Sequence, residues 1–445
     1  MNSARFCPPP VAATEPGFLR ALEPATIQAL AQQQLGVDAT VVTLHPDYVR
    51  WKDRDGSLVG YRAVVQSAEG EVHTYLTVRT AAPHRLADEA ERLQHRAAED
   101  HAGLRAFALV PAADVLLLAF PIDRVLPDLR RLVRASKLRS LVGDCCPTLI
   151  PAGLRLSKSR SHCRIVRYKP ERRAVLHWDL GFVDGDNQLV SRRSLWVRCH
   201  AETQASRTST ATTAAAATGV ACPATLGQAH ERLLLEDHLD GEVWNPFSPT
   251  TNDAATSSAA ATVAHLHDAR LPASLPHHGP VHELDLVLRA AEDLARLDPQ
   301  LGREAHRIAD QLAHAVPMAS APVLAHGDLH PEQVLLQGPH GAGLVDFDRA
   351  CIAPAALDLA NLQACCLVAD PLRGAAVARR FLAEYGRHRR APAATELAWW
   401  TGCALVRSAT TPFRRLQADW PAAAAKRLEQ AAELLGAAMA REGTS

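Results

Sequence analysis

The chain has 445 residues, a length that exceeds one compact core and predicts two or three structural units. Lys+Arg and Asp+Glu both number 48, so the formal net charge is zero, which excludes a general electrostatic partner such as nucleic acid or an anionic membrane. Ten cysteines without a CxxC pair, no signal-like lead and no apolar run of membrane-spanning length predict a cytoplasmic protein with reduced thiols.

The first third of the chain has the pattern of a small α+β unit. Residues 1–20 are rich in proline and are predicted to form a disordered lead. Residues 21–150 are predicted to form an N-terminal α+β unit. Its expected elements are strands at 38–44, 48–51, 58–66 and 72–79 with turns at Asp55-Gly56 and Glu69-Gly70, a helix at 85–100 and a strand at 115–121.

The remainder of the chain changes from strands to helices. Residues 151–242 are predicted to form a β-rich lobe, with strands at 162–169, 173–182, 193–200 and 233–239 and a helix at 202–217. Residues 243–445 are predicted to form a helical lobe, which two short apolar strands interrupt. Trp399 and Trp400 are adjacent and cannot both face one core easily, so one of them is a candidate for a contact surface, with an exposed aromatic of no function as the alternative.

The segment AHGDLHPEQVLLQGPHGAGLVDFD, residues 325–348, concentrates acidic and imidazole groups around two apolar runs. Phosphoryl transfer needs one carboxylate to orient an acceptor hydroxyl and oxygen ligands for magnesium. Asp328, Gln333 and Asp346 supply those groups. A second chemistry is a zinc hydrolase with His326, Asp328 and His330 as ligands, which leaves Gln333 and the flanking strands without a role.

HGDLHPEQ resembles the H-x-D-x-x-x-x-N catalytic loop of the aminoglycoside phosphotransferase and choline kinase group, whose members are relatives of protein kinases. LVDFD is similar to the strand that carries their metal-binding aspartate. Four further segments resemble the family in the same order: RIVRYKPERRAVLHW, LLLEDHLDGEVW, AHLHDARL and IAPAALDLANL. Gln333, in place of the usual asparagine, resembles maltokinase-like and glucosamine kinase-like sugar kinases, which also carry an N-terminal cap.

The resemblance implies an α+β, bilobal protein kinase-like fold, with a small β lobe, a large helical lobe and an additional N-terminal unit. It implies a small-molecule kinase that uses Mg²⁺ and ATP, with GTP as the alternative, and phosphorylates a hydroxyl of a sugar, amino sugar or aminoglycoside-like acceptor. The implied residues are Asp328 for catalysis; Gln333, Asp346 and Asp348 for metal; Arg198, Lys169, Arg172, Arg173, Glu236 and His238 for nucleotide; His326 and Asp358 for structural support; and His330 for acceptor contact.

The sequence also departs from the family pattern. Arg198 stands where the family has a lysine, and Glu202 is the only acid between Arg198 and Gly219 that could hold it. A catalytically inactive, nucleotide-binding module is therefore the alternative to an active kinase, and the zinc hydrolase is a further one. The predicted partners are a nucleotide and a small hydroxylated substrate, and the sequence does not indicate an oligomeric state.

Overall fold

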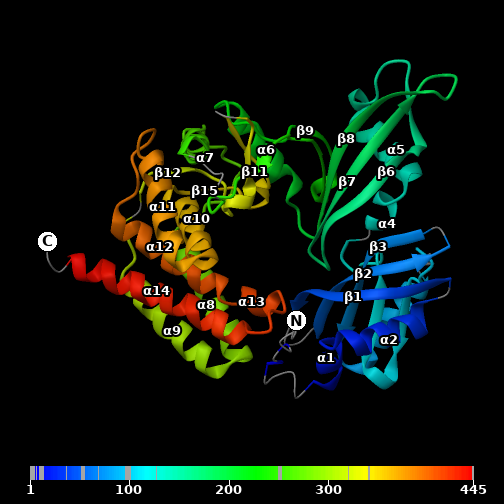
Figure 1. Cartoon of the computed structure of the whole chain (residues 1–445), viewed down its shortest axis with the longest axis horizontal. Helices are drawn as coiled ribbons and strands as arrows, with labels where there is room; N and C mark the ends of the chain where they lie inside the picture. The colour runs from blue at the N-terminus through cyan, green and yellow to red at the C-terminus, as the bar shows by residue number, and fades with distance from the viewer. Residues whose placement is uncertain are drawn as a thin grey trace. The chain divides into compact units, whose positions relative to one another are not determined.

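The structure, a computed structural model, describes residues 6, 8–9, 15–36, 38–51, 56–68, 70–95, 102–126, 128–248, 253–318, 320–338 and 341–442. The chain divides into two compact units, whose elements are labelled in Figure 1. Residues 1–203 and 411–421 form the first unit, and residues 204–410 and 422–445 form the second. No helix of the described part is both long enough and apolar enough to cross a membrane.

The first unit begins with a five-stranded antiparallel sheet in the order β1-β2-β3-β5-β4. Its strands are β1 (Ala39–Arg50), β2 (Ser57–Ser67), β3 (Gly70–Thr80), β4 (Phe107–Val110) and β5 (Val115–Ala119). Helices α1 (Pro16–Ala21), α2 (Pro24–Leu35) and α3 (Pro83–His95) pack on this sheet. The apolar face of α3, with Leu86, Ala90 and Leu93, buries against Leu116 and Leu118 of β5.

Two details of this sheet differ from the predicted pattern. The strands expected at 38–44 and 48–51 are one strand, β1, with register shifts between Val41 and Thr43 and between Pro46 and Tyr48. The second shift lies at Pro46, which cannot donate a ladder hydrogen bond. Asp55 and Glu69, the predicted first turn residues, lie outside the described part. Their neighbours Gly56 and Gly70 have φ of 79° and 115°, a conformation that favours glycine.

The first unit continues with a long antiparallel meander. Strands β6 (Arg155–Lys169), β7 (Arg173–Val183) and β8 (Leu189–His200) pair in sequence, as the alternating pattern predicted. Helices α4 (Leu129–Leu132) and α5 (Ala135–Cys145) precede it, and α5 packs on β6. The buried Trp178 of β7 donates its indole N–H to the Leu132 carbonyl oxygen of α4 at 3.1 Å. The short helix α13 (Thr411–Arg414) also belongs to this unit.

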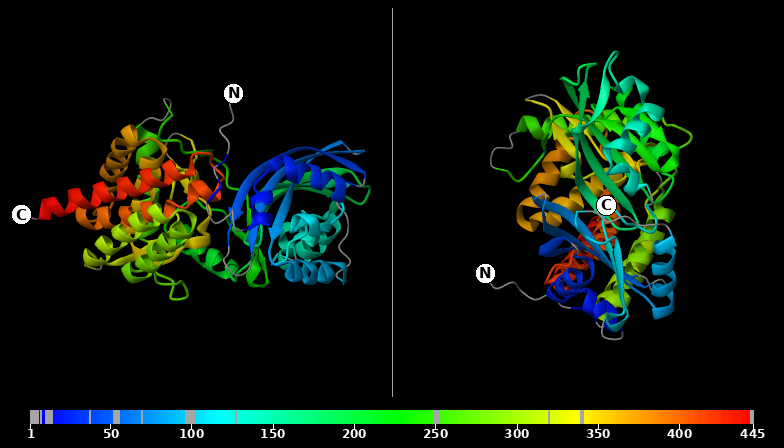
Figure 2. Two further views of the ribbon diagram at one scale, coloured as in Figure 1. Left: turned by 90° about the horizontal axis from the view of Figure 1, so that it is seen from below. Right: turned by 90° about the vertical axis from the view of Figure 1, so that its right-hand side faces the viewer.

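The second unit is mostly helical. Its helices are α6 (Ala205–Ala216), α7 (Asp253–His267), α8 (Pro280–Leu297), α9 (Pro299–His314), α10 (Ala356–Ala369), α11 (Pro371–Tyr385), α12 (Ala394–Ser408) and most of α14 (Trp420–Glu442). Its strands are β9 (Thr225–Ala229), β10 (Leu233–Asp237), β11 (Glu242–Val243), β12 (Pro322–Ala325), β13 (Val334–Leu336), β14 (Ala342–Leu344) and β15 (Cys351–Pro354). Helix α10 packs against both α11 and α12. Figure 2 gives two further views of the ribbon.

The predicted α+β class is confirmed, whereas the prediction of a disordered lead is wrong for residues 16–20. Residues 16–20, assigned to a disordered lead, lie in α1, where Phe18 is fully buried and Arg20 donates to Asp114 at 2.8 Å. Residues 1–5, 7 and 10–14 of that lead lie outside the described part. The predicted boundaries at 150 and 242 stay predictions, and the first compact unit holds the N-terminal α+β segment together with β6, β7 and β8.

The two adjacent tryptophans of α12 are both buried, with 2% of Trp399 and 1% of Trp400 exposed. The expectation that one of them marks a surface is therefore wrong. Helix α12 has neighbours on several sides, α8, α9 and α10, so successive residues can face different helices. Trp399 donates to the Leu312 carbonyl oxygen of α9 at 2.9 Å, while the Trp400 ring lies 6.1 Å from the His278 ring.

The contact between α8 and α9 generates a stability prediction. A Cβ at Gly302 would lie 2.2 Å from the Ala295 Cα, whereas a Cβ at the exposed Gly436 of α14 would meet nothing within 4 Å. Gly302→Ala should therefore destabilise the protein by about 1–3 kcal/mol through overpacking, despite the better helix propensity of alanine. Gly436→Ala, the control, should stabilise it by about 0.5–1 kcal/mol. Urea unfolding measures both, and equal effects of the two substitutions would contradict the prediction.

Candidate active site

The buried carboxylate of Asp358, in the first turn of α10, fixes the start of the motif loop. Asp358 is fully buried and accepts hydrogen bonds from the backbone N–H of His326 at 2.6 Å and of Gly327 at 2.8 Å. The ring of His267, the last residue of α7, donates to the same carboxylate at 3.1 Å. These bonds satisfy a charge that burial alone would make costly. Asp358 thus joins α7, α10 and the motif loop, and its predicted supporting role stays a prediction.

Electrostatics agrees with that role. Burial alone would raise the pKa of Asp358, but the hydrogen bond and charge of His267 and the contacts of His326 together lower the pKa below its ordinary value. The carboxylate is therefore ionised over the physiological pH range.

His326, the first residue of the motif, is fully buried and supports the loop from the other side. Its Nε2–H donates to the Val345 carbonyl oxygen at 2.8 Å, and its ring packs on Phe347 at 5.0 Å between centroids. The loop that follows β12 is thereby tied to the segment that follows β14. The structural support expected of His326 stays a prediction.

Gly327 is required by its surroundings as well as by its backbone conformation. Its φ is 78°, and a Cβ there would lie 2.0 Å from the Arg349 carbonyl oxygen. Two backbone segments consequently touch at this point, one carrying Asp328 and the other ending at Arg349. The glycine in the HGD sequence is the only residue type that allows this approach.

The β13–β14 hairpin brings Gln333 and Asp346 together. Val334 pairs with Leu344, and the Val345 N–H donates to the Gln333 carbonyl oxygen at 3.0 Å, so the hairpin places residues 333 and 346 at the same end. The Gln333 Nε2 donates to the Asp346 Oδ2 at 3.2 Å. Asp346 adopts a left-handed conformation with φ of 68°, which asparagine and aspartate tolerate better than most residues.

Asp328 and His330 lie at the open side of this loop. The Asp328 side chain is 45% exposed, and its Oδ2 lies 3.8 Å from the Arg349 Nε. His330 Nε2 lies 3.0 Å from the Gln333 Nε2 and can accept a hydrogen bond from it. Burial lowers the pKa of His330, although the charges of Asp328 and Glu332 oppose that shift. The neutral imidazole is favoured at neutral pH.

Asp348 differs from its neighbour Asp346 in environment. Only 4% of Asp348 is exposed, and its Oδ1 accepts a hydrogen bond from the Thr208 hydroxyl of α6 at 3.3 Å. Helix α6 is therefore attached to the acidic segment. Thr208 was not singled out from the sequence, because a threonine in an alanine-rich helix carries no signal of a partner 140 positions away.

The site can be tested against the two metals considered from the sequence. The Asp346 carboxylate is a hard oxygen donor that suits Mg²⁺, which is commonly bound through one or two carboxylates plus substrate phosphates and water. Gln333 presents its Nε2 to Asp346 at 3.2 Å, so its amide oxygen would join the same ion after rotation of the amide group. Across the described part of the chain, no three His, Cys, Asp or Glu side chains converge as a metal site. The zinc alternative also needs His326, whose Nε2 is already bonded to Val345.

Strand β10 and the turn after it carry the two predicted adenine-side residues of the second unit. Glu236 is buried, whereas His238 is exposed and its Nε2 lies 3.2 Å from Asp240. The turn lies beside the β13–β14 hairpin, because β11 pairs with β13, and a Cβ at Gly343 would lie 2.9 Å from Leu239. The segment expected at the base is thus adjacent to the hairpin that carries Gln333 and Asp346.

The other predicted nucleotide contacts belong to the first unit. Arg198 lies on β8 and is buried, and its backbone is paired with that of Val175 on β7. At the β6–β7 turn, Lys169 and Arg173 are half-buried and Arg172 is exposed. Glu202, the only acid between Arg198 and Gly219, precedes α6 rather than lying within it. The contact of these basic groups with a nucleotide stays a prediction.

A second network, which the sequence did not reveal, supports the Gly327 carbonyl group. The Asn361 amide donates to that carbonyl oxygen at 3.4 Å and accepts from the Arg407 Nη2 at 2.9 Å. Arg407 pairs with the fully buried Glu283 at 2.6 Å, and Glu283 also bonds His278 at 2.6 Å. Residues from α8, α10 and α12 meet here, and no local pattern relates positions so far apart in the chain.

The anchoring carboxylate predicts a pH-dependent loss of stability. Asp358→Asn should destabilise the protein by about 2–3 kcal/mol at pH 7, because it removes a charged acceptor of two backbone N–H groups. The folded pKa of Asp358 is lowered, so its contribution is present above the unfolded pKa of about 3.9 and is lost as the pH falls through the folded value. The difference in unfolding free energy between variant and unaltered protein should hence narrow below about pH 4.

Asp298→Asn is the matched control for urea unfolding across this pH range. Asp298 caps α9 by accepting from the N–H groups of Gln300 and Leu301, and asparagine caps a helix about equally well. Its substitution should change stability little. A loss at Asp358 no greater than at Asp298 would contradict the anchoring role.

Comparison with known proteins shows what the region around these residues is similar to. Residues 184–400 match the model of the phosphotransferase enzyme family, APH. The homoserine kinase of Bradyrhizobium sp. (strain ORS 278) is 40% identical over 81 residues, 18% of this chain and 25% of the kinase. The homoserine kinase of Pseudomonas aeruginosa (strain UCBPP-PA14) is 39% identical over 105 residues, 22% of this chain and 33% of the kinase.

The chain therefore spans at most a third of the length of these two relatives. Among solved structures, choline kinase from Cryptosporidium parvum Iowa II is similar with a TM-score of 0.51 and 12% identity, over 69% of this chain and 97% of the choline kinase. At that identity the likeness shows the fold, which is the expected protein kinase-like fold. The family match over residues 184–400, just under half of the chain, makes this region similar to the phosphotransferase enzyme family.

Proposed function

We propose that this protein transfers the γ-phosphate of ATP to a hydroxyl group of a small molecule. The observation that carries the proposal is the arrangement of Asp328, Gln333 and Asp346 around one buried anchor, Asp358. Phosphoryl transfer depends mainly on positioning and charge stabilisation, and a rigid loop beside two oxygen donors meets both needs. The match of residues 184–400 to the phosphotransferase enzyme family model supports the same chemistry.

Asp328 is the candidate that orients the acceptor hydroxyl and accepts its proton. The carboxylate is half-exposed, as a group that meets an incoming substrate must be, and its backbone is held through Gly327. Arg349 lies 3.8 Å away and is exposed, so it can stabilise negative charge close to Asp328. The supporting residues His326 and Asp358 then act through the loop and not on the substrate.

Gln333 and Asp346 would hold Mg²⁺ in this proposal. Bound there, Mg²⁺ supplies charge neutralisation to the nucleotide phosphates. Asp348 accepts a hydrogen bond from Thr208 and so connects the acidic segment to α6. Asp348 is also the alternative metal ligand. Neutral His330 beside Gln333 orients the amide group, and a contact with the acceptor stays its proposed second role.

Arg198, Lys169, Arg172 and Arg173 are proposed phosphate contacts, and the backbone near Glu236 and His238 is the proposed base contact. ATP is the proposed donor and GTP the alternative. Asp346 and Gln333 belong to one hairpin that lies beside residue Leu239, which supports a continuous nucleotide site within the second unit. The cytoplasmic location remains a prediction from the sequence.

The acceptor class has two candidates. Gln333 in the H-G-D-L-H-x-x-Q pattern favours a sugar, amino sugar or aminoglycoside-like molecule. The local similarity to two homoserine kinases favours homoserine, an amino acid with a primary hydroxyl. A panel of sugars, amino sugars, aminoglycosides and homoserine, assayed by acceptor-dependent ADP release, separates the two candidates. Nucleotide binding without ADP release across the panel would support the inactive module instead.

Asp328→Asn should reduce turnover by about 10²–10⁴-fold, the range for a positioned acid–base group, because the amide cannot accept the hydroxyl proton. Nucleotide binding should remain within about twofold, since Asp328 is not among the proposed metal or nucleotide ligands. Steady-state ADP release and MgATP titration measure the two effects. Full activity in this variant would remove Asp328 from the mechanism.

Asp346→Asn should have the complementary effect on binding. In the unaltered protein, ligand at one hundred times its dissociation constant contributes about 2.7 kcal/mol of stability, so Mg²⁺ and ATP together should raise the melting temperature by several degrees. Asp346→Asn should lose most of the shift that requires Mg²⁺ and keep any shift with ATP alone. Asp328→Asn, which should retain the full shift, is the control. A full shift with Asp346→Asn would contradict its role as metal ligand.

A further inference from the structure

The turn between β6 and β7, residues 170–172, is buried at its tip. Pro170 and Glu171 are buried, with 6% of Glu171 exposed, whereas Arg172 is exposed. Hairpin tips usually lie in solvent and are mobile. This tip instead lies against the N-terminal sheet of the same compact unit, the strands β1 to β5.

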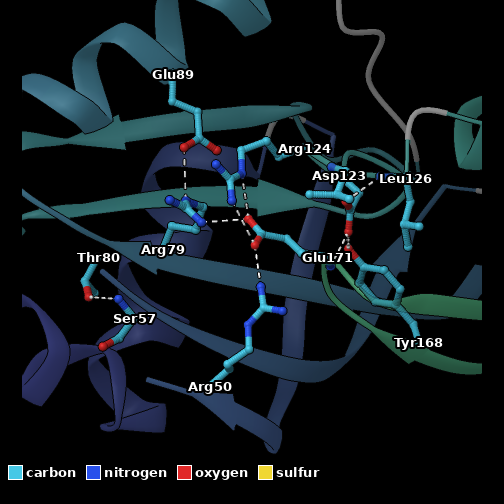
Figure 3. A network of polar contacts seen from close by, with 11 residues as sticks. Arg50, Ser57, Arg79, Thr80, Glu89, Asp123, Arg124, Leu126, Tyr168 and Glu171 are labelled. Carbon is cyan, nitrogen blue, oxygen red and sulfur yellow. Dashed lines mark hydrogen bonds and ion pairs between the residues drawn. The ribbon is translucent and has the colours of Figure 1, made fainter. Parts of the chain in front are cut away.

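Three arginines from that sheet and its following loop surround the Glu171 carboxylate (Figure 3). The Arg79 Nη1 of β3 donates to Oε1 at 2.6 Å, and Arg124 donates its Nε to Oε1 at 2.9 Å and its Nη2 to Oε2 at 3.2 Å. Arg50, at the end of β1, donates to Oε2. Arg79 is itself held by Glu89 of α3 at 3.0 Å.

The backbone of the turn is held independently by Asp123. Its Oδ2 accepts from the Glu171 N–H at 2.8 Å and from the Tyr168 hydroxyl at 2.7 Å, while its Oδ1 accepts from the N–H of Val125 and Leu126. The Tyr168 ring packs edge-on against Phe120 at 5.2 Å. Both the side chain and the main chain of residue 171 are thus fixed by the N-terminal sheet and the loop that follows β5.

The geometry leaves little room for another conformation of the turn. Glu171 has a φ of 57°, an uncommon value for a residue other than glycine, and the hydrogen bonds described above maintain it. On the neighbouring strand β2, a Cβ at Gly60 would lie only 3.2 Å from the Pro170 ring. The glycine therefore allows the proline of the turn to approach the sheet.

The pKa values of the two carboxylates that contact Arg79, those of Glu171 and Glu89, shift in opposite directions. Burial would raise the pKa of Glu171, but the hydrogen bond of Arg124 and the charges of Arg79, Arg124 and Arg50 together lower it. For Glu89, burial is the largest effect and the pKa is raised. Buried ion pairs contribute little net stability, and in some proteins they select one conformation among several. The Glu171 carboxylate is therefore ionised, and its contacts with the three arginines hold the turn against the sheet.

We infer that Glu171 is a positioning residue, and that the N-terminal sheet holds the β6–β7 turn in the one conformation in which its basic residues meet nucleotide phosphates. This inference rests on the proposed function. The turn contains Arg172 and is flanked by Lys169 and Arg173, and these three residues are the candidate phosphate contacts. A fixed turn would avoid the loss of affinity that accompanies ordering of a mobile loop on binding.

The test compares variants that change the local charge in opposite directions. Glu171→Gln makes the cluster more positive, and Arg50→Met makes it less positive, yet both remove a contact between the turn and the sheet. Glu89→Gln is the matched control, since it weakens a contact to the same Arg79 without touching the turn. Dissociation constants for MgATP and for adenosine are measured on the full chain by calorimetry or competition.

Both Glu171→Gln and Arg50→Met should weaken MgATP binding by about tenfold, the loss expected if the competent turn falls to about a tenth of the population. Adenosine, which lacks phosphates, should bind equally to all variants, and Glu89→Gln should bind MgATP like the unaltered protein. If Glu171→Gln does not fold, Arg50→Met, whose arginine is partly exposed, decides the question.

Opposite shifts for Glu171→Gln and Arg50→Met would overturn the inference in favour of a charge effect alone. An equal loss with Glu89→Gln, or an equal loss of adenosine affinity, would overturn it in favour of general destabilisation. Unchanged MgATP affinity in both turn variants would overturn the inference while leaving the proposed function intact. Absence of MgATP binding by the unaltered protein would overturn both.

Discussion

The candidate site depends on one buried carboxylate. Asp358 accepts the backbone N–H groups of His326 and Gly327, and it can do so only because α10 begins directly beneath the loop. The ends of α7 and α11 contribute as well, since His267 bonds both Asp358 and Tyr385. A charge held this deeply needs every one of its partners, which ties the position of the loop to the packing of three helices.

The sequence predicted the parts of this arrangement that follow local rules. The alternating strands of the first unit, the amphipathic helices and the acidic hairpin all have short-range signatures, and the register of β13 and β14 brings Gln333 to Asp346 as the motif implied. Gly327 was part of the quoted motif, and the structure supplies its physical reason in the contact with Arg349.

The parts that the sequence did not predict depend on distant partners. Arg407 and Glu283 are 124 positions apart and meet only because α8 and α12 pack together. Thr208 holds Asp348 from a helix whose sequence is nearly featureless. The charged KPERRA turn carries no local signal of burial, yet its glutamate is enclosed by arginines from three separate places in the chain. Tertiary context decided each of these positions.

The contact between Gly327 and the Arg349 carbonyl oxygen has a consequence for how such a protein can diversify. The two segments that would carry the proton acceptor and the cation ligands touch through their main chains, so the spacing between them is independent of side-chain identity elsewhere. Helices outside this contact can exchange residues and bind differently shaped acceptors while the reacting geometry is retained. A change of substrate would then require changes in the side chains that surround the acceptor, and none in the segments that carry Asp328 and Asp346.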